Sequence, residues 1–106
     1  MKNYNKLVRD NIPQILKNNG QRGQFKVLDE NEYRLQLRQK LKEEVKEYFL
    51  AENDDSSIEE LSDIIEVIHS LANVHKQSVE SLEKKRLEKL TERGGFKNRI
   101  ILIATE

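Results

Sequence analysis

Proline and glycine, the residues that most often interrupt helices, are scarce in this chain, which has one Pro and four Gly among 106 residues. Between these few interruptions, apolar residues recur three and four positions apart over long stretches, the spacing of an amphipathic helix. The sequence therefore predicts one all-α domain over residues 1–106. Its expected core is an antiparallel helical hairpin, within a set of about four helices.

The expected helices follow from this periodicity and from capping residues. They cover residues 11–18, residues 30–51, a third stretch that begins after a cap at Ser56 or Ser57, and residues 78–92. Asp29 is the expected N-cap of the second helix, because its carboxylate can accept a hydrogen bond from a free backbone N–H of the first turn. Phe25 to Leu28 and Arg99 to Ile103 read as short strands that pair the two ends of the domain.

The composition narrows the class of protein. The formal net charge is zero, from 19 basic and 19 acidic residues, and this balance argues against direct nucleic-acid binding. The absence of Cys excludes disulfides and thiolate zinc sites. No apolar run resembles a signal peptide or a membrane span, so we expect a soluble, cytoplasmic protein without a membrane partner. Apolar residues make up only 36% of the chain, which favours a homo-oligomer because a thin core stabilises a small domain poorly.

Two acidic pairs are the strongest functional signal. Glu44 and Glu47 lie three residues apart on the second expected helix, and Glu60 and Asp63 lie three apart on the third. Residues at this spacing share a helix face, so two antiparallel helices can direct four carboxylates to one place. Carboxylates are preferred ligands of Mg²⁺, with Mn²⁺ as an alternative. A divalent ion held in this way indicates chemistry on a phosphate substrate.

The helical wheel places each acidic pair at the border of its helix's apolar face. Four carboxylates at a seam repel one another unless a cation or a basic partner group offsets them. The alternative is that these acids belong to ordinary solvated helix faces, with Lys42 and Lys46 as surface partners of the first pair.

Three blocks of the sequence, taken in order, resemble MazG-like nucleotide pyrophosphohydrolases. These enzymes belong to the all-α NTP pyrophosphatase superfamily, and the match is to its phosphoribosyl-ATP pyrophosphohydrolase-like subgroup. The blocks are Tyr4 to Pro13, the two acidic pairs, and Arg93 to Ile100. The resemblance covers nearly the whole chain as a single MazG-like domain.

The resemblance implies an enzyme that uses Mg²⁺ to cleave a nucleoside triphosphate to a monophosphate and pyrophosphate, clearing non-standard or excess nucleotides. The catalytic and metal-binding residues would be Glu44, Glu47, Glu60 and Asp63. One glutamate, which the sequence does not single out, would orient or deprotonate the attacking water. The family usually forms homodimers or homotetramers.

Basic residues inside the matching blocks are the candidates for binding the substrate's phosphates. They are Lys6, Arg9, Lys85 and Arg93. Two other functions stay open: phosphoribosyl-ATP pyrophosphohydrolysis, and a non-catalytic helical module that binds a nucleotide or a protein.

Overall fold

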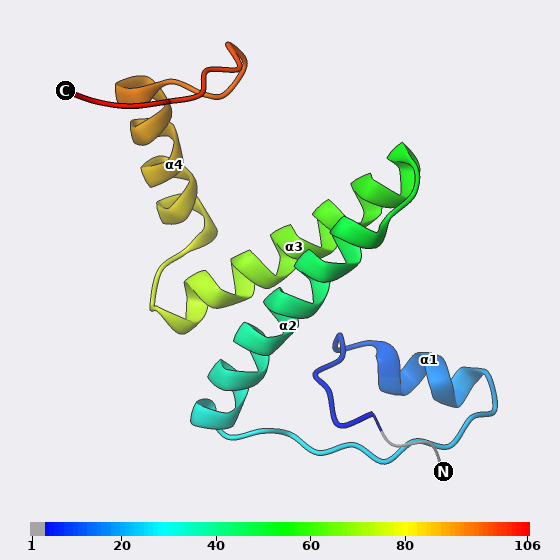
Figure 1. Cartoon of the computed structure of the whole chain (residues 1–106). Helices are drawn as coiled ribbons and strands as arrows, with labels where there is room; N and C mark the ends of the chain where they lie inside the picture. Colours follow the sequence, from blue (N-terminus) through cyan, green and yellow to red (C-terminus); the bar gives the residue numbers. More distant parts are fainter. Residues whose placement is uncertain (1–3) are drawn as a thin grey trace.

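The computed structural model describes residues 4–106 and shows an all-helical protein, which confirms the predicted class (Figure 1). The helices of the described residues are α1 (Ile12–Asn18), α2 (Glu30–Leu50), α3 (Asp54–Val74) and α4 (Val79–Arg93). None of them combines the length and the apolar character that a membrane crossing requires.

Polar caps fix where the two long helices begin. The carboxylate of Asp29 accepts a hydrogen bond of 2.8 Å from the backbone N–H of Glu32, as the sequence predicts. The expected cap of α3 was wrong, because Asn53, and not Ser56 or Ser57, precedes the first helical residue and accepts from the N–H of Ser56 at 2.8 Å. Two aspartates then occupy the first turn of α3, where negative charge is favourable.

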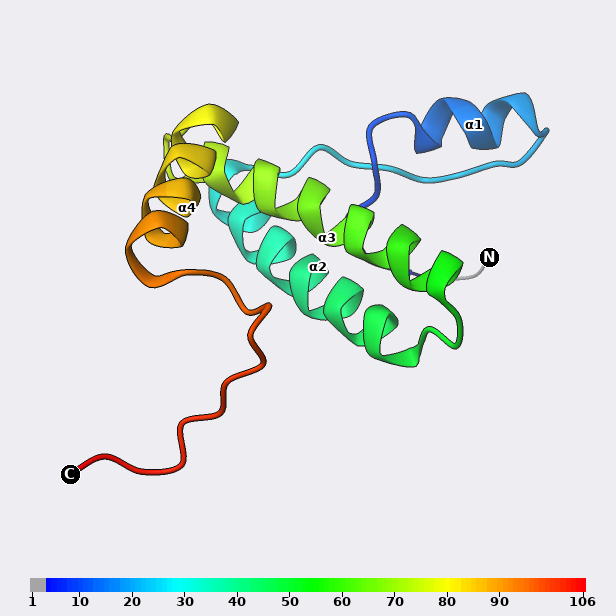
Figure 2. The same cartoon turned by 90° about the horizontal axis from the view of Figure 1, so that it is seen from above.

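Helices α2 and α3 form the predicted antiparallel hairpin, and they make most of the contacts between helices (Figure 2). The fully buried apolar side chains of the described residues are Leu37 from α2 and Val67 and Ala72 from α3. The hairpin is therefore the only part of the described chain with a buried core, and the core is small.

The remaining helices flank the hairpin. Helix α4 packs against α3 alone and lies beside its C-terminal end (Figures 1 and 2). There a hydrogen bond from Arg86, together with the nearby charge of His69 on α3, lowers the pKa of Glu83. The residues before α1 pass along a different side of the hairpin and reach it through polar side chains.

The predicted β element was wrong, because no residue between 4 and 106 belongs to a strand. The two segments expected to pair lie far apart, with residues 21–29 beside α1 and the tail after α4 at the other end of the molecule (Figure 1). Both are extended and open to solvent, with Val27 exposed by 99% and Ile103 by 93%. A β-branched sequence becomes a strand only when a neighbour pairs with its backbone, and within one chain no neighbour is near.

Candidate metal centre

Three of the four predicted carboxylates converge between α2 and α3. Glu44, Glu60 and Asp63 each offer an oxygen, and these oxygens all lie within 4.8 Å of one another. All three side chains are half-buried. We call these residues the acidic group. Their position follows from helix geometry, because Glu60 and Asp63 share a face of α3 and the antiparallel partner brings Glu44 opposite to them.

Glu47, the fourth predicted carboxylate, lies beside the acidic group without joining it. Its side chain is exposed. Its negative charge nevertheless contributes to raising the pKa of Glu60. The structure thus places Glu47 close enough to act electrostatically on the acidic group, but outside the set of oxygens that meet.

Glu60 is the member of the acidic group whose negative charge is least compensated by its surroundings. Partial loss of hydration, followed by the charges of Asp63 and Glu44, raises the pKa of the Glu60 carboxyl. A hydrogen bond with the Glu44 side chain raises this pKa further. Within residues 4–106, no ion pair includes Glu60. A bound cation would therefore stabilise the negative charge of Glu60 more than that of Glu44 or Asp63.

Two basic side chains compensate the other members of the acidic group. Arg9 Nη2 lies 2.7 Å from Asp63 Oδ1, and Lys40 Nζ lies 3.3 Å from Glu44 Oε1. Counting both ion pairs, the group of three carboxylates keeps one uncompensated negative charge. The acidic group is therefore partly neutralised by its two basic neighbours.

A cleft lies between the N-terminal segment and α2, and one of its lining residues, Lys40, pairs with Glu44 of the acidic group. Its volume is about 490 Å³. Four lysines line it, together with two glutamines, Tyr4 and one acid, Glu43. The lysines are Lys6, Lys40, Lys42 and Lys46. We call this feature the lysine cleft, and its excess of positive charge suits an anionic ligand.

Lys40 joins the lysine cleft to the acidic group, and Lys6 lies close to Lys40. Lys6 Nζ lies 3.2 Å from Glu43 Oε1, and Lys40 Nζ lies 3.7 Å from the same oxygen. Since Lys40 also pairs with Glu44, it stands at the boundary between the negative and the positive parts of the site. At Lys40, a ligand that carries both a metal ion and phosphates would therefore meet carboxylates on one side and a basic side chain on the other.

The acidic group fits a small divalent cation. Mg²⁺ binds oxygens at about 2.0–2.1 Å, so two of its ligands lie at most about 4.2 Å apart. Three oxygens cannot all lie at this largest separation around one octahedral ion, so the oxygens of the acidic group, within 4.8 Å of one another, would move closer together when they bind it. The donors are all carboxylate oxygens, which favours Mg²⁺ or Mn²⁺ over softer metals.

The other two predicted substrate-binding residues lie elsewhere. Lys85 and Arg93 belong to α4, which packs beside the C-terminal end of α3, whereas Glu60 and Asp63 lie in its N-terminal half. Lys85 pairs with Glu88 on its own helix at 3.5 Å. Within one chain the structure therefore brings Arg9 to the acidic group and Lys6 to the lysine cleft, but brings Lys85 and Arg93 to neither.

Sequence reasoning did not single out Lys40. It named Lys42 and Lys46 as surface partners of the first acidic pair, yet the ion pair with Glu44 comes from Lys40. The signal was present, because Lys40 precedes Glu44 by four residues, a spacing that places two side chains together on a helix. The lysine cleft itself could not be read from the sequence, since it forms only when the N-terminal segment lies along α2.

Comparisons of the chain with known protein families, with curated proteins and with solved structures find no match. The geometry of the acidic group and of the lysine cleft is therefore the main support for a functional conclusion.

Proposed function

We propose that this protein is a Mg²⁺-dependent nucleotide pyrophosphohydrolase, an enzyme that cleaves a nucleoside triphosphate to a monophosphate and pyrophosphate. One observation carries the proposal: the carboxylates of Glu44, Glu60 and Asp63 meet within 4.8 Å from two helices, and Lys40, which pairs with Glu44, also lines a cleft with three further lysines. The motif resemblance of the sequence agrees with this function.

The acidic group would hold the metal. When bound, Mg²⁺ would polarise phosphate oxygens and lower the pKa of a water molecule. Glu60 is the central ligand in this proposal, because its charge is the least compensated. Glu47 lies beside the group and is exposed, which leaves its carboxylate available to orient the attacking water.

The basic side chains would hold the phosphates. Lys6 and Lys40 line the part of the lysine cleft nearest to Glu44 and can offset the charge of the β- and γ-phosphates. Water would add to the α-phosphorus, the bond from this phosphorus to the bridging oxygen would break, and pyrophosphate would leave with its charge balanced by the lysines.

The decisive test is a screen for pyrophosphate release. Common and damaged nucleoside triphosphates and phosphoribosyl-ATP would each be incubated with the full chain and Mg²⁺. We expect release from at least one triphosphate, and EDTA should abolish it because the metal is removed.

The screen also separates the alternatives. Turnover of phosphoribosyl-ATP alone would assign the other enzymatic function. If no compound is hydrolysed and a nucleotide without Mg²⁺ raises the melting temperature, the chain is a binding module, since a ligand stabilises the folded state to which it binds.

Arg9 provides a further test of the phosphate contacts. Its ion pair with Asp63 is largely exposed, so it adds little to stability. We expect Arg9→Gln to raise the KM for the nucleotide about tenfold, the cost of one charge-assisted hydrogen bond, and to lower kcat less. The matched control is Lys17→Gln, an exposed basic residue on α1. Equal KM values for the two variants would show that Arg9 does not contact substrate.

A further inference from the structure

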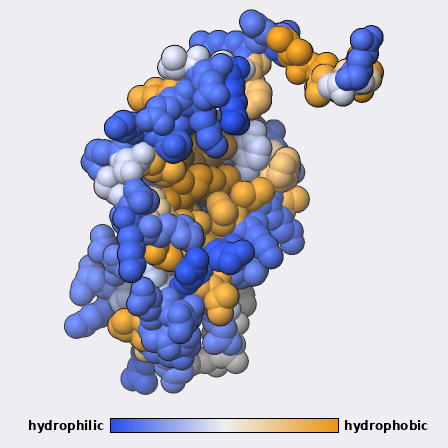
Figure 3. Space-filling view, turned by 90° about the vertical axis from the view of Figure 1, so that its left-hand side faces the viewer, coloured by the Kyte–Doolittle hydropathy of each residue, from blue (hydrophilic) through white to orange (hydrophobic). Residues whose placement is uncertain are grey.

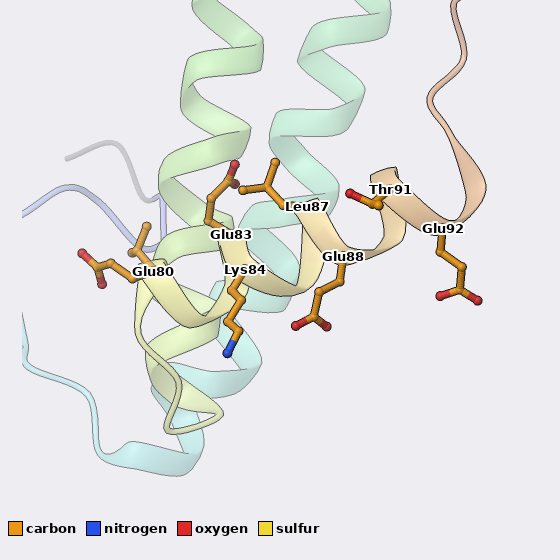
Figure 4. Close-up of a pocket in the computed structure, with 8 residues that line it drawn as sticks. Glu80, Glu83, Lys84, Leu87, Glu88, Thr91 and Glu92 are labelled. Carbon is orange, nitrogen blue, oxygen red and sulfur yellow. The ribbon is translucent and has the colours of Figure 1, made fainter.

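The cleft on α4 has the wrong charge for a nucleotide. Its volume is about 800 Å³, and four glutamates and one lysine line it together with apolar side chains. Figure 3, which views the α4 side of the molecule, shows apolar side chains gathered in a hollow of this face. Figure 4 shows the glutamates spread along the length of α4. This excess of carboxylates repels phosphates, so α4 does not compete with the lysine cleft for a nucleotide.

The lysine cleft contains more than the basic side chains that phosphates require. Tyr4 lines it from the N-terminal segment, and Gln36 and Gln39 line it from α2. Tyr4 is exposed by 65%, so a flat ligand can reach its ring. An aromatic ring is a stacking platform for a nucleobase, because every base has a π-face.

A series of close contacts leads from the Tyr4 ring to the acidic group. Lys6 Nζ lies 5.8 Å from the centroid of this ring and 3.2 Å from Glu43 Oε1. Lys40 Nζ lies 3.7 Å from the same oxygen and pairs with Glu44 of the acidic group. The site thus has an aromatic ring at one end, lysines in the middle and carboxylates at the other end. A nucleoside triphosphate has the matching order of base, phosphates and bound cation.

The two glutamines lie on the face of α2 that borders the lysine cleft. Gln36, Gln39 and Glu43 are three and four residues apart, which places them on one side of the helix. Gln36 is half-buried and Gln39 is exposed. An amide side chain offers a donor and an acceptor together, which matches the edge of a base such as adenine, whereas an ionised phosphate only accepts. The glutamines therefore suit the edge of a base.

We propose that Tyr4 stacks on the base of the bound nucleotide and that Gln36 and Gln39 form hydrogen bonds with the edge of this base. This inference rests on the proposed function and narrows it, because the substrate becomes a nucleoside triphosphate with an intact base and not any polyphosphate. The volume of the lysine cleft, about 490 Å³, lies within the range of small-molecule sites. Lys6 then contacts the phosphates beside the stacked base.

The test measures binding without turnover, by titration calorimetry of the full chain with Mg²⁺. The probes are triphosphates of the common nucleosides in which a methylene group replaces the oxygen between the α- and β-phosphorus. The same analogue of ribose 5′-triphosphate, which has no base, completes the set. The best base-bearing analogue should bind at least about fivefold more tightly than the abasic one, since one stacked base contributes that much.

Tyr4→Ala should weaken the binding of the base-bearing analogues at least about fivefold. It should leave the affinity for the abasic analogue unchanged, because it removes the ring and no charge. Tyr4→Phe keeps a stacking face and should bind every analogue as the parent does. The double variant Gln36→Leu with Gln39→Leu should reduce the differences in affinity among the base-bearing analogues without changing the affinity for the abasic one.

The matched control is Phe96→Ala, which removes an aromatic ring exposed by 98% that does not line the lysine cleft. It should bind every analogue as the parent does. Equal binding of base-bearing and abasic analogues by the parent would overturn this inference alone. So would a loss of the preference for a base in Phe96→Ala but not in Tyr4→Ala. If the parent binds none of the analogues, the proposed function fails together with this inference.

Discussion

Replacing Glu60 with glutamine should lower the rate of Mg²⁺-dependent pyrophosphate release at least about 100-fold, because loss of a metal ligand costs more than the 10–100-fold typical of an outer-shell partner. The same substitution should raise the melting temperature of the metal-free protein at neutral pH. Glutamine keeps the size of the side chain and removes a charge that is repelled by Asp63 and Glu44.

The pH dependence of this stabilisation follows from the raised pKa of Glu60. In the folded state the carboxyl binds a proton more readily than in the unfolded chain, so the parent loses stability as the pH rises from the ordinary value of 4.5 through the raised one. Above the raised pKa of Glu60, this loss of stability no longer changes with pH. The difference in melting temperature between Glu60→Gln and the parent should therefore be largest at neutral pH and vanish below about 4.5.

The control for this experiment is Glu59→Gln, which removes the neighbouring exposed charge of the same helix. It should change neither activity nor the dependence of stability on pH. Mg²⁺ should stabilise the parent and the control but not Glu60→Gln, as thermal scans with and without the ion would show. Full activity of Glu60→Gln would exclude Glu60 from the metal centre.

Shortening Leu37 to alanine should give the largest loss of stability of any alanine substitution in α2, because Leu37 is the buried residue of this helix. This side chain is exposed by only 3%, and removing a buried leucine costs about 2–4 kcal/mol through lost burial and the cavity left behind. A domain has only about 5–15 kcal/mol of net stability, so the variant should melt more than about 10 °C below the parent.

Leu35→Ala is the matched control, since it makes the same chemical change two residues away at a position exposed by 64%. It should alter the free energy of unfolding by less than about 0.5 kcal/mol. Both variants are to be compared at one protein concentration, because any self-association would couple stability to concentration. Equal losses of unfolding free energy in Leu37→Ala and Leu35→Ala would show that Leu37 does not belong to the core.

The parts of the fold that depend on local spacing could be predicted from the sequence. Apolar periodicity and the scarcity of glycine and proline predicted the helices. The spacing of Glu60 and Asp63 predicted that these two side chains share one helix face. The convergence of Glu44 with them followed from the antiparallel hairpin, because a short turn leaves two helices no other partner as close.

The parts that depend on distant segments could not be predicted. The run from Arg99 to Ile103 has the composition of a strand, but composition does not say whether a partner is within reach. The ion pair of Arg9 with Asp63 joins residues 54 positions apart, and no periodicity relates them. Ile65 lies at helical spacing with the apolar residues of α3 and is nevertheless exposed by 51%, since a pattern alone does not reveal which neighbour covers an apolar face.

The attachment of the N-terminal segment has a consequence for any assay of this protein. Lys6 and Arg9 fasten this segment to the hairpin through ion pairs whose side chains are partly open to water. Mobile ions weaken such pairs, since the screening length falls from about 10 Å at 0.1 M to about 3 Å at 1 M. Ionic strength thus sets how firmly the first segment is tethered, so concentrated salt loosens one wall of the lysine cleft while leaving the hairpin intact.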